Sequence, residues 1–597
     1  MGKDGPLALQ HGPLTVYLQP HPGCPDLHAL IQGLPPGEPV VWCDSARRHP
    51  VTGRWSLLGF DPWLTLTARG DRLELHTSAS THVWRDHPLD ALRRILRRYR
   101  APAPAAGRDV PHGRAVGLMG FLSYDLNRWI ERLPPPQEGG TPTPEMRWFG
   151  MRVVVLVDHL EERSWLLGVA DPHSPPRLAR RQALEALERV GAQLAEPREP
   201  ADGAAEEGTT APPALDATST QAAFEAMVAR ALEHIRAGDI FQANVSQRFT
   251  APWRARPLPL YAALRRINPS PFACFLSCED LAVVSCSPER LVRVQGRRID
   301  TRPIAGTRPR GATPAEDALN SLDLLLSDKE RAEHIMLVDL ARNDLGRVCE
   351  AGTVGVNDLM SLEEYSHVIH IVSDVSGALR RGADAVDVIR AVFPGGTITG
   401  CPKVRCMQLL RELEPVARGL YTGSLGTLGF DGTMDLNIAI RTMVLQGGRL
   451  SFHVGAGIVA DSDPGREYRE TLDKAGALLA ALRADGPSGP GALRTAGAAR
   501  DLELPTAYPA AALGPAARPA RREECRVLDP STQTTSNAAG RRRSAQPSVK
   551  PRVAAAGPVA VVAPPRRSAA TTPSSSRLGH EARARATRFA RYAVGSS

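Results

Sequence analysis

Apolar residues recur at spacings of three and four just after residue 220. They are Phe224, Met227, Val228, Leu232 and Ile235. This spacing places them on one face of a helix, as is typical of a helix that packs one side against a core. Gly238 follows the last apolar position, where a glycine favours the end of a helix. The pattern therefore predicts an amphipathic helix that ends at this glycine.

The period changes to two between residues 420 and 460. Leu436, Ile438 and Ile440 alternate there with Asn437, Ala439 and Arg441. Gly447 and Gly448 give a turn signal before another apolar run at residues 450–459. Alternation on both sides of a glycine turn predicts a β-hairpin. The side chain of Arg441 would lie on the face opposite the isoleucines, in a cleft or in solvent.

Shorter runs divide the first part of the chain. Residues 55–60 and 152–158 have the composition of strands, and residues 90–99 have a helical pattern. Residues 196–220 are rich in Ala, Pro, Glu and Thr without periodicity, which predicts a surface linker. We therefore expect four parts. These are an α+β scaffold half at residues 1–195, the linker at 196–220, a second folded half at 221–486 and a tail at 487–597.

The formal net charge of +9 belongs to the tail. Residues 487–597 contain 18 Lys and Arg against 6 Asp and Glu, so the rest of the chain is slightly acidic. The tail has no helical periodicity, and we expect a disordered basic extension of low complexity. A nucleic-acid-binding module is the alternative, but such modules usually combine positive charge with aromatic stacking platforms. We therefore do not expect nucleic acid as a partner.

Composition excludes several other classes. No run of about 18 apolar residues could cross a bilayer, and residues 1–20 lack the apolar core of a secretory signal. The nine cysteines include no CxxC pair and are too sparse for a disulfide scaffold. We expect a soluble cytoplasmic protein with free thiols and no membrane partner.

One carboxylate is directed at the apolar side of a predicted helix. Ser327 and Glu330 form a capping box that opens the helix, and Glu333 lies on its apolar stripe. Burying an unpaired carboxylate is very costly, so Glu333 must meet a metal, a proton or a cation. An ion pair with Arg331 or Arg342 is the alternative without a functional role.

A second predicted helix begins at Asp463-Pro464 and carries Glu467, Glu470 and Lys474 on one face. Two neighbouring carboxylates repel each other unless a positive charge lies beside them. If Glu333 joins the pair, three carboxylates supply the hard oxygen ligands that suit Mg²⁺. An ordinary ion pair with Lys474 is the alternative.

A glycine-rich segment at residues 394–400 leads into a helix that has Pro402 at its start and Lys403 in its first turn. Free backbone N–H groups and the helix dipole favour an anion at such a start. The segment is not a P-loop, because no Gly-Lys-Ser/Thr sequence is present. An anion site and a tight structural turn are equally compatible with it.

Several further segments gain meaning only in combination. In chain order they are residues 238–248, 287–290, 302–310, 333–344, 365–370, 439–442, 455–459 and 467–475. Over residues 220–482 this series resembles the chorismate-binding enzymes, which include the large subunits of anthranilate synthase and aminodeoxychorismate synthase. Looser similarity extends upstream to residues 42–45, 55–62 and 117–134. The resemblance implies an α+β chorismate-utilising fold, with antiparallel sheets packed as a β-sandwich-like core and helices outside. It makes 221–486 the catalytic half.

The resemblance implies a magnesium site and two binding sites for the substrate, chorismate. The ligands of Mg²⁺ would be Glu333, Glu467 and Glu470. The ring carboxylate would be bound by Lys474 and by the backbone at Gly455 and Gly457. The enolpyruvyl carboxylate would be bound by Tyr421 and Arg441. This division is chemically sensible, because a dianionic substrate needs cations at both ends.

The resemblance also implies which residues act on the ring. Glu289 matches the general acid that protonates the departing 4-hydroxyl, and Thr397 and His370 lie beside the ring. Relatives that add water, the isochorismate and salicylate synthases, carry a Lys at the position of Gln242. A neutral Gln cannot act as a base, whereas ammonia is already nucleophilic and needs none. The resemblance therefore implies amination at C2 of chorismate.

Two groups of aminating enzymes remain. Many aminodeoxychorismate synthases carry Pro-Ile-Lys-Gly-Thr, whose lysine is thought to attack C2, but residues 303–307 read Pro-Ile-Ala-Gly-Thr, as in anthranilate synthases. Residues 123–133 and 396–407 instead look like a second group of aminodeoxychorismate synthases, some of which lack that lysine. We expect aminodeoxychorismate synthase component I, acting in p-aminobenzoate and folate biosynthesis. Anthranilate synthase component I, acting in tryptophan biosynthesis, is the alternative.

The source of ammonia is also implied by what the cysteines lack. Hydrolysis of glutamine needs an activated cysteine with a histidine. None of the nine cysteines lies in the Gly-x-Cys-x-Gly elbow of glutamine amidotransferases. We therefore expect ammonia to come from a separate glutamine amidotransferase subunit.

Overall fold

The computed structural model separates residues 1–514 from residues 515–597, and the described residues all belong to the first unit. They are residues 5–49, 52–102, 111–137, 139–140, 142–195, 214–311, 313–364, 368–484, 493–495 and 498–502.

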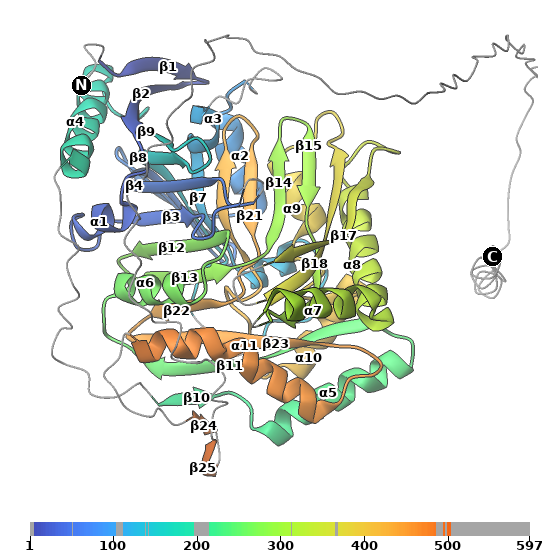
Figure 1. The fold of residues 1–597 in the computed structure, drawn as a ribbon. Helices are drawn as coiled ribbons and strands as arrows, with labels where there is room; N and C mark the ends of the chain where they lie inside the picture. Colours follow the sequence, from blue (N-terminus) through green and yellow to red (C-terminus); the bar gives the residue numbers. More distant parts are fainter. Residues whose placement is uncertain are drawn as a thin grey trace, which may run out of the picture. The chain divides into compact units, whose positions relative to one another are not determined.

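The first layer of the molecule is a continuous antiparallel ladder, whose strands run across Figure 1. Its strands, in order across the sheet, are β1 (Leu7–His11), β2 (Leu14–Pro22), β9 (Arg163–Val169), β8 (Met146–Asp158), β4 (Trp55–Arg69), β3 (Val40–Asp44), β12 (Phe272–Cys278), β13 (Leu281–Ser287), β22 (Thr442–Gln446), β23 (Arg449–Ile458) and β11 (Gln242–Pro252). The short strands β10 (Leu215–Ala217) and β19 (Gly400–Cys401) both pair with β11. Because β3 pairs with β12, the predicted halves share this sheet.

A second antiparallel layer runs in a different direction behind the first (Figure 1). Its strands, in order, are β7 (Gly117–Leu122), β20 (Ser424–Gly429), β21 (Met434–Asn437), β14 (Arg290–Gln295), β15 (Arg298–Thr301) and β18 (Val368–Ala378), with β16 (Ile304–Pro309) and β17 (Gly355–Glu364) also paired to β18. Strands β5 (Arg72–Thr77) and β6 (Thr81–Arg85) extend β4. The layers are continuous, since residues 146–150 of β8 pair with β7 and residues 153–158 pair with β9.

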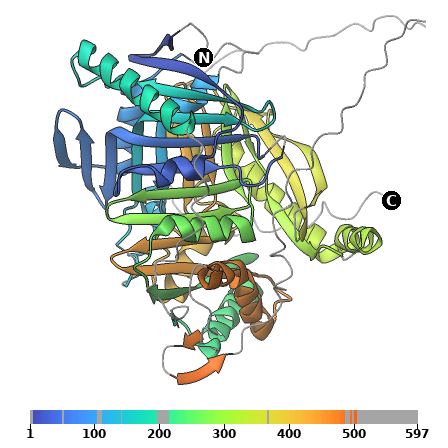
Figure 2. The same cartoon turned by 60° about the vertical axis from the view of Figure 1, so that its left-hand side comes forward.

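Helices cover both outer faces of this sandwich (Figures 1 and 2). One core fills the space between the outer face of the first layer and α1 (Leu27–Gln32), α4 (Pro176–Ala195), α5 (Gln221–Arg236), α6 (Pro257–Ile267), α10 (Lys403–Leu413) and α11 (Pro464–Ala484). A second core joins the two layers to α2 (Pro88–Arg98), α8 (Asp328–Gly346) and α9 (Ala385–Val392). The remaining helices are α3 (Pro111–Ala115), the 3₁₀ helix η1 (Tyr124–Trp129) and α7 (Pro314–Leu326). The predicted α+β, sandwich-like class is therefore confirmed.

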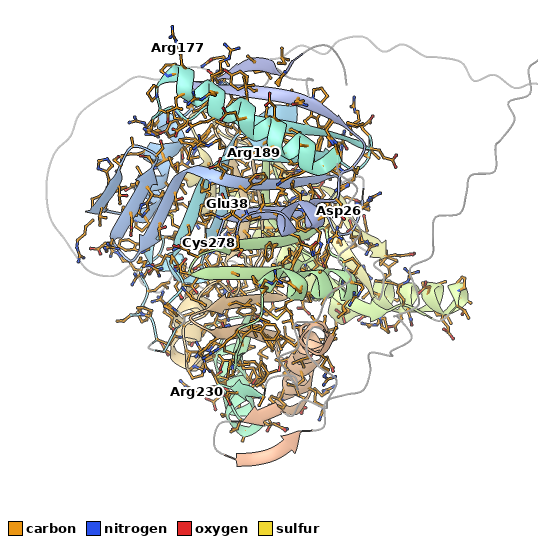
Figure 3. All side chains as sticks on the ribbon, turned by 90° about the vertical axis from the view of Figure 1, so that its left-hand side faces the viewer. Asp26, Glu38, Arg177, Arg189, Arg230 and Cys278 are labelled. Carbon is orange, nitrogen blue, oxygen red and sulfur yellow. The ribbon has the colours of Figure 1, made fainter. Side chains whose placement is uncertain are left out.

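Side-chain alternation divides residues between the two cores. On β3, Val40 and Trp42 face the helix-covered core, whereas Val41 faces the core between the layers. Successive residues of a strand point to opposite faces, so a single strand supplies both cores. Helix α4 shows the helical equivalent, because Ala179, Ala183 and Ala186 are buried while Arg177 and Arg189 lie on its exposed side (Figure 3).

Most of the predicted local signals are confirmed. Helix α5 spans the predicted amphipathic segment, and Gly238 behind it has a φ of 78°. Helix α8 starts after Ser327, whose side chain accepts a hydrogen bond from the backbone N–H of Glu330. Strands β22 and β23 form the predicted hairpin, in which Gly447 and Gly448 both have positive φ, as a tight turn with right-handed strand twist requires.

One strand prediction is wrong. The period-two pattern extends through Ile440, but β21 ends at Asn437. Arg441 has a φ of 50°, in the left-handed region that side-chain-bearing residues rarely adopt. This backbone turn interrupts the alternation between β21 and β22, so the face of Arg441 could not be read from the pattern.

The predicted linker and tail are described only in part. Strand β10 lies within the linker, and β24 (Leu493–Thr495) and β25 (Ala498–Leu502) lie within the tail, where β24 pairs with β10. Residues 196–213 of the linker lie outside the described part, as do all tail residues except 493–495 and 498–502. Disorder of the tail therefore stays a prediction. Among the described residues, no helix has the length and apolarity needed to cross a membrane.

Candidate functional site

Gln242 is held at the start of β11 by three elements. Its backbone pairs with Cys401 of β19, and its carbonyl accepts a hydrogen bond of 3.0 Å from the Cys406 thiol of α10. Its side-chain Nε2 donates to Oε1 of Glu333 at 2.9 Å. The side-chain Oε1 of Gln242 is buried and has no hydrogen-bond partner among the described residues. One N–H of the amide is therefore used, and its oxygen acceptor is available.

Glu333 on α8 and Glu467 on α11 share an electrostatic environment. Burial raises the pKa of both carboxyls, and neighbouring Glu330 and Glu470, respectively, raise them further. Lys329 and Lys474 act on both carboxyls in the opposite direction. The carboxylates predicted on separate helices therefore lie around the same pair of lysines.

Glu470 differs from these two carboxylates. Its side chain is half exposed, and Lys474 Nζ lies 2.7 Å from its Oε1. The ion pair that the sequence left open as an alternative is thus present. By contrast, Glu333 accepts a hydrogen bond from Gln242, and Arg342 pairs with Asp339 instead of Glu333.

The predicted magnesium ligands do not form a compact cluster. Within the part of the chain that the structure describes, no group of three or more His, Cys, Asp and Glu side chains could hold a metal ion. The donor set nevertheless suits a hard cation, because Oε2 of Glu467 is buried and has no hydrogen-bond partner among the residues that the structure describes. A divalent cation between Glu333 and Glu467 would satisfy this oxygen and offset the burial of two carboxylates.

Two glycines of β23 leave space for neighbouring side chains. A Cβ at Gly455 would lie 2.8 Å from the hydroxyl of Tyr421 and 2.8 Å from the carbonyl of Val245. A Cβ at Gly457 would lie 2.8 Å from Nε2 of Gln242. Lys474 Nζ donates to the carbonyl of Gly455 at 3.1 Å. The predicted positions Gly455, Gly457, Lys474, Tyr421 and Gln242 are thus neighbours.

These contacts predict different costs for two matched substitutions. Gly455→Ala should destabilise the protein by about 1–3 kcal/mol, because its methyl group meets backbone that cannot move away easily. Gly457→Ala should cost less stability, since the flexible Gln242 side chain can shift, but it should lower activity by displacing that amide. Urea denaturation and ammonia-dependent turnover measure the two effects. Equal loss of stability in both variants would contradict this distinction.

Glu289 lies immediately before β14 and accepts a hydrogen bond of 2.9 Å from the hydroxyl of Thr397. Burial raises the pKa of this carboxyl to about 7, although the Thr397 hydroxyl opposes the shift. Both residues line a small cavity of about 30 Å³. Glu289 can therefore carry a proton near neutral pH, which a general acid requires.

His370 on β18 is held by the backbone carbonyl of Gly306, 3.2 Å from its Nδ1. Because a carbonyl can only accept, this contact assigns the proton to Nδ1. Burial lowers the pKa of His370 to about 4, and the nearby positive charge of Arg441 also lowers it. His370 is therefore neutral at physiological pH. The Arg441 guanidinium also donates to Oδ1 of Asn268 at 3.3 Å.

Tyr421 is buried between an aromatic ring and a cation. Its ring stacks on His453 with a centroid distance of 5.1 Å, and the guanidinium of Arg418 lies 5.5 Å from the ring centroid. Burial raises the pKa of the Tyr421 hydroxyl, so this group stays protonated and can donate a hydrogen bond.

Arg418 and Glu414 form a buried ion pair that the sequence interpretation missed. Two guanidinium nitrogens of Arg418 donate to the two carboxylate oxygens of Glu414 at 2.6 and 2.8 Å. Arg418 also donates to the carbonyls of Asn244 and Ile398, while Glu414 accepts from the backbone N–H and hydroxyl of Ser246. The pair therefore connects β11 to the segment that carries Thr397. The (i, i+4) spacing of Glu414 and Arg418 was its only local signal.

Lys403 supports the structural alternative for the glycine-rich turn. Its Nζ lies 2.7 Å from Oδ2 of Asp344 and donates to the carbonyls of Val392 and Pro394, each at 3.1 Å. The side chain is 8% exposed. Its charge is therefore used to fix the turn against α8 and not to hold an exogenous anion.

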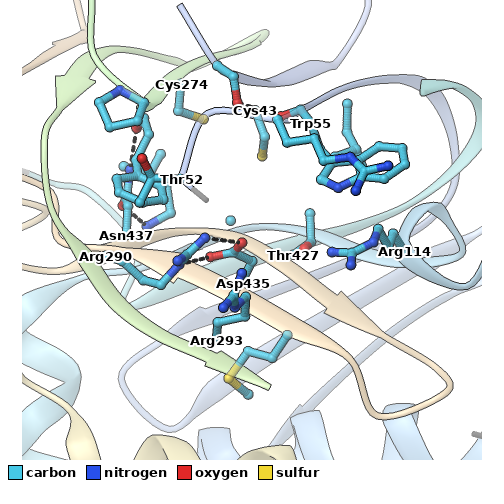
Figure 4. Close-up of a pocket in the computed structure, with 18 of the residues that line it drawn as sticks. Cys43, Thr52, Trp55, Arg114, Cys274, Arg290, Arg293, Thr427, Asp435 and Asn437 are labelled. Carbon is cyan, nitrogen blue, oxygen red and sulfur yellow. Dashed lines mark hydrogen bonds and ion pairs between the residues drawn. The ribbon is translucent and has the colours of Figure 1, made fainter. Parts of the chain in front are cut away.

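A larger cavity of about 300 Å³ lies outside the predicted site (Figure 4). Residues of both predicted halves line it, including Cys43 and Trp55 from the first and Cys274 from the second. Arg290 points into it and forms two hydrogen bonds with Asp435, of 2.8 and 3.0 Å. Arg290 follows Glu289 in the chain and lines both the larger and the smaller cavity.

Comparison with known proteins adds to this geometry. The sequence model of a family described as chorismate binding enzyme matches residues 44–480. Anthranilate synthase component 1 of Streptomyces coelicolor is 45% identical over 403 residues, covering 66% of this chain and 77% of that protein. Aminodeoxychorismate synthase component 1 of Bacillus subtilis is 40% identical over 447 residues, covering 73% and 92%.

A solved structure is also similar to this chain. The crystal structure of anthranilate synthase component I from Streptococcus pneumoniae is similar with a TM-score of 0.63 and 33% identity. The match covers 72% of this chain and 94% of that one.

Proposed function

Because the chain belongs to the chorismate binding enzymes, we propose that it aminates chorismate as component I of an aminodeoxychorismate synthase. In the proposed reaction, chorismate and ammonia give 4-amino-4-deoxychorismate and water. The 4-hydroxyl leaves with a proton, and a C–N bond at C4 replaces the C–O bond, whereas the amination at C2 that the resemblance implied would lead to anthranilate. The product would enter p-aminobenzoate and folate biosynthesis.

The observation that carries amination over hydration is the state of the Gln242 amide. Its Nε2 is bound to Glu333, while its buried Oε1 has no partner among the described residues. A neutral acceptor of this kind can hold ammonia by one N–H and leave the nitrogen lone pair free to attack. It cannot take a proton from water, which would need a base to become a nucleophile.

The other predicted residues supply the complementary chemistry. Glu289 gives its proton to the leaving hydroxyl, and the Thr397 hydroxyl orients the carboxyl by its 2.9 Å hydrogen bond. Lys474 and Arg441 provide the positive charge for the two carboxylates of chorismate, and Tyr421 donates a hydrogen bond. The neutral His370 lies near Arg441 and contacts the ring without adding charge.

The proposal includes magnesium, which would supply positive charge for the ring carboxylate of the substrate. Glu333 and Glu467 would hold the ion, because Glu333 is partly buried, Glu467 is buried, and Oε2 of Glu467 has no hydrogen-bond partner among the described residues. Bound there, Mg²⁺ would neutralise the carboxylates and polarise the substrate. Glu470 would join it only after leaving Lys474, with which it now pairs.

Anthranilate synthase component I is the second candidate, in which chorismate and ammonia give anthranilate, pyruvate and water. Ala305 favours it, since the position has no nucleophilic side chain, and so does the 45% identity to the Streptomyces protein. The 40% identity to the Bacillus protein, over 92% of its length, is in line with our first choice.

The product decides between the two candidates. The purified full-length chain is incubated with chorismate, Mg²⁺ and ammonium at raised pH, and the products are separated with and without an aminodeoxychorismate lyase. We expect p-aminobenzoate only when the lyase is present. Anthranilate formed without the lyase would overturn our first choice, and omitting Mg²⁺ tests the metal.

Replacing Gln242 with Lys tests the nucleophile. A lysine would supply the base that water needs, so we expect Gln242→Lys to lose ammonia-dependent product and to gain a hydrated product from chorismate. Liquid chromatography of the reaction mixture measures both. An unchanged product distribution would contradict the role of the Gln242 amide.

The ammonia would come from a separate glutamine amidotransferase subunit. The chain alone should therefore use ammonium but not glutamine, whereas addition of a purified amidotransferase partner should permit use of glutamine. Product formed from glutamine by this chain alone would refute this part of the proposal.

A further inference from the structure

Cys43 and Cys274 lie directly opposite each other on neighbouring strands. Cys43 belongs to β3 and Cys274 to β12, and the register of this antiparallel pair matches the two residues with each other. Opposite residues of an antiparallel pair point to the same face of the sheet. Both side chains accordingly face the space between the two layers and line the larger cavity, where Figure 4 shows them on one wall.

The spacing of such a pair suits a covalent bond. Directly opposite residues in an antiparallel ladder have Cα atoms about 4.5–5.5 Å apart. This range lies within the separation of about 4.4–6.8 Å that disulfides span without backbone movement. The two thiols already interact. A hydrogen bond with Cys43 is the main cause that raises the pKa of the Cys274 thiol, and burial is the second cause.

Access to the pair is unequal. Cys43 is partly exposed, whereas Cys274 is 2% exposed. A small oxidant can therefore reach the Cys43 sulfur first, and Cys274 is positioned to attack it from the opposite strand. This division between an accessible thiol and a buried resolving thiol is the arrangement that converts a mixed disulfide into an internal one.

We propose that Cys43 and Cys274 are a redox modification site, at which a low-molecular-weight disulfide such as oxidised glutathione links β3 to β12. The Cys43 thiolate attacks one sulfur of the reagent, whose S–S bond breaks and releases one thiolate. Cys274 then loses its proton to water, and its sulfur attacks Cys43 and releases the second thiolate. Two protein thiols lose two electrons, and the reagent is reduced to two thiols.

The bond would act on the boundary between the predicted halves. Strand β3 comes from the first half and β12 from the second, and the two strands are neighbours in the first layer. A disulfide between residues so distant in sequence restricts the unfolded chain strongly. Oxidation should therefore stabilise the protein and change one wall of the larger cavity.

The test uses the full-length chain, treated with oxidised glutathione and digested without reduction. We expect mass spectrometry to identify a peptide pair joined through Cys43 and Cys274, with two of the nine thiols lost. We also expect the melting temperature to rise by roughly 5 °C, and to fall back to that of the untreated protein when dithiothreitol is added.

Two serine variants control this experiment. Cys43→Ser should abolish both the linked peptide and the rise in melting temperature. Cys278→Ser, which alters another cysteine of β12 (Figure 3), should change neither. The proposal is overturned if oxidation joins other cysteines, if no linked pair forms in the wild-type chain, or if Cys43→Ser keeps the thermal shift.

Discussion

Replacing Glu289 with Gln should lower the rate of amination by roughly 100- to 10,000-fold, the usual contribution of a general acid. The amide keeps the size of the carboxyl and can still accept the Thr397 hydrogen bond, but it has no proton to give to the leaving hydroxyl. Steady-state kinetics with chorismate and ammonia measure the loss. The Michaelis constant for chorismate should change little, because the proton is transferred only in the reaction.

The pH dependence identifies the acid. The wild-type rate, divided by the concentration of unprotonated NH₃, should fall as the pH rises above about 7, because Glu289 then loses its proton. This pKa of about 7 lies above the ordinary carboxyl value of 4.5. The free energy of unfolding should therefore fall as the pH rises from 4.5 to about 7, because the unfolded chain loses this proton first. Glu289→Gln should lack this loss of stability. Glu412→Gln, which alters an exposed carboxyl of α10, is the matched control, and an equal loss of rate there would contradict the assignment.

Removing Arg418 should have the largest effect on stability. Arg418→Met leaves Glu414 buried without its cation, which typically costs about 3–5 kcal/mol of the free energy of unfolding. Activity should fall as well, because the pair connects β11, which carries Gln242, to the segment that carries Thr397. Urea denaturation and ammonia-dependent turnover measure the two effects.

A second variant separates the ion pair from simple loss of packing. Adding Glu414→Gln to Arg418→Met removes the unpaired charge, so the double variant should be more stable than Arg418→Met alone. Asp339→Asn breaks an exposed pair with Arg342 and should cost less than about 1 kcal/mol. A double variant less stable than Arg418→Met would show that the charge is not the cause.

Local patterns predicted the elements well where one interaction decides the outcome. The start of α8 depends on Ser327 and the N–H of Glu330, which lie three residues apart in sequence. The turn between β22 and β23 depends on two adjacent glycines. Arg441 lies beyond such reasoning, because its positive φ is imposed by the join between two strands that pair with different partners.

The site was predictable in its residue types but not in its pairings. The helical face that bears Glu467, Glu470 and Lys474 followed from spacing, whereas the approach of α8 to α11 depends on the packing of distant segments. The same limit explains why Lys403 was open to two interpretations, since its partner Asp344 lies on another helix. The Arg418 network was missed because two of its acceptors, the carbonyls of Ile398 and Asn244, are backbone groups that every residue possesses.

The sheet that joins the two halves also bears on how the chain is made. Strand β3 pairs with β12, and β7 pairs with β20, so early strands require neighbours that leave the ribosome much later. Until then their edges have unpaired N–H and C=O groups, which can pair with other chains. Such distant pairings also slow folding. The first half is therefore a vulnerable nascent segment, whose protection by chaperones during translation would determine how much enzyme the cell obtains.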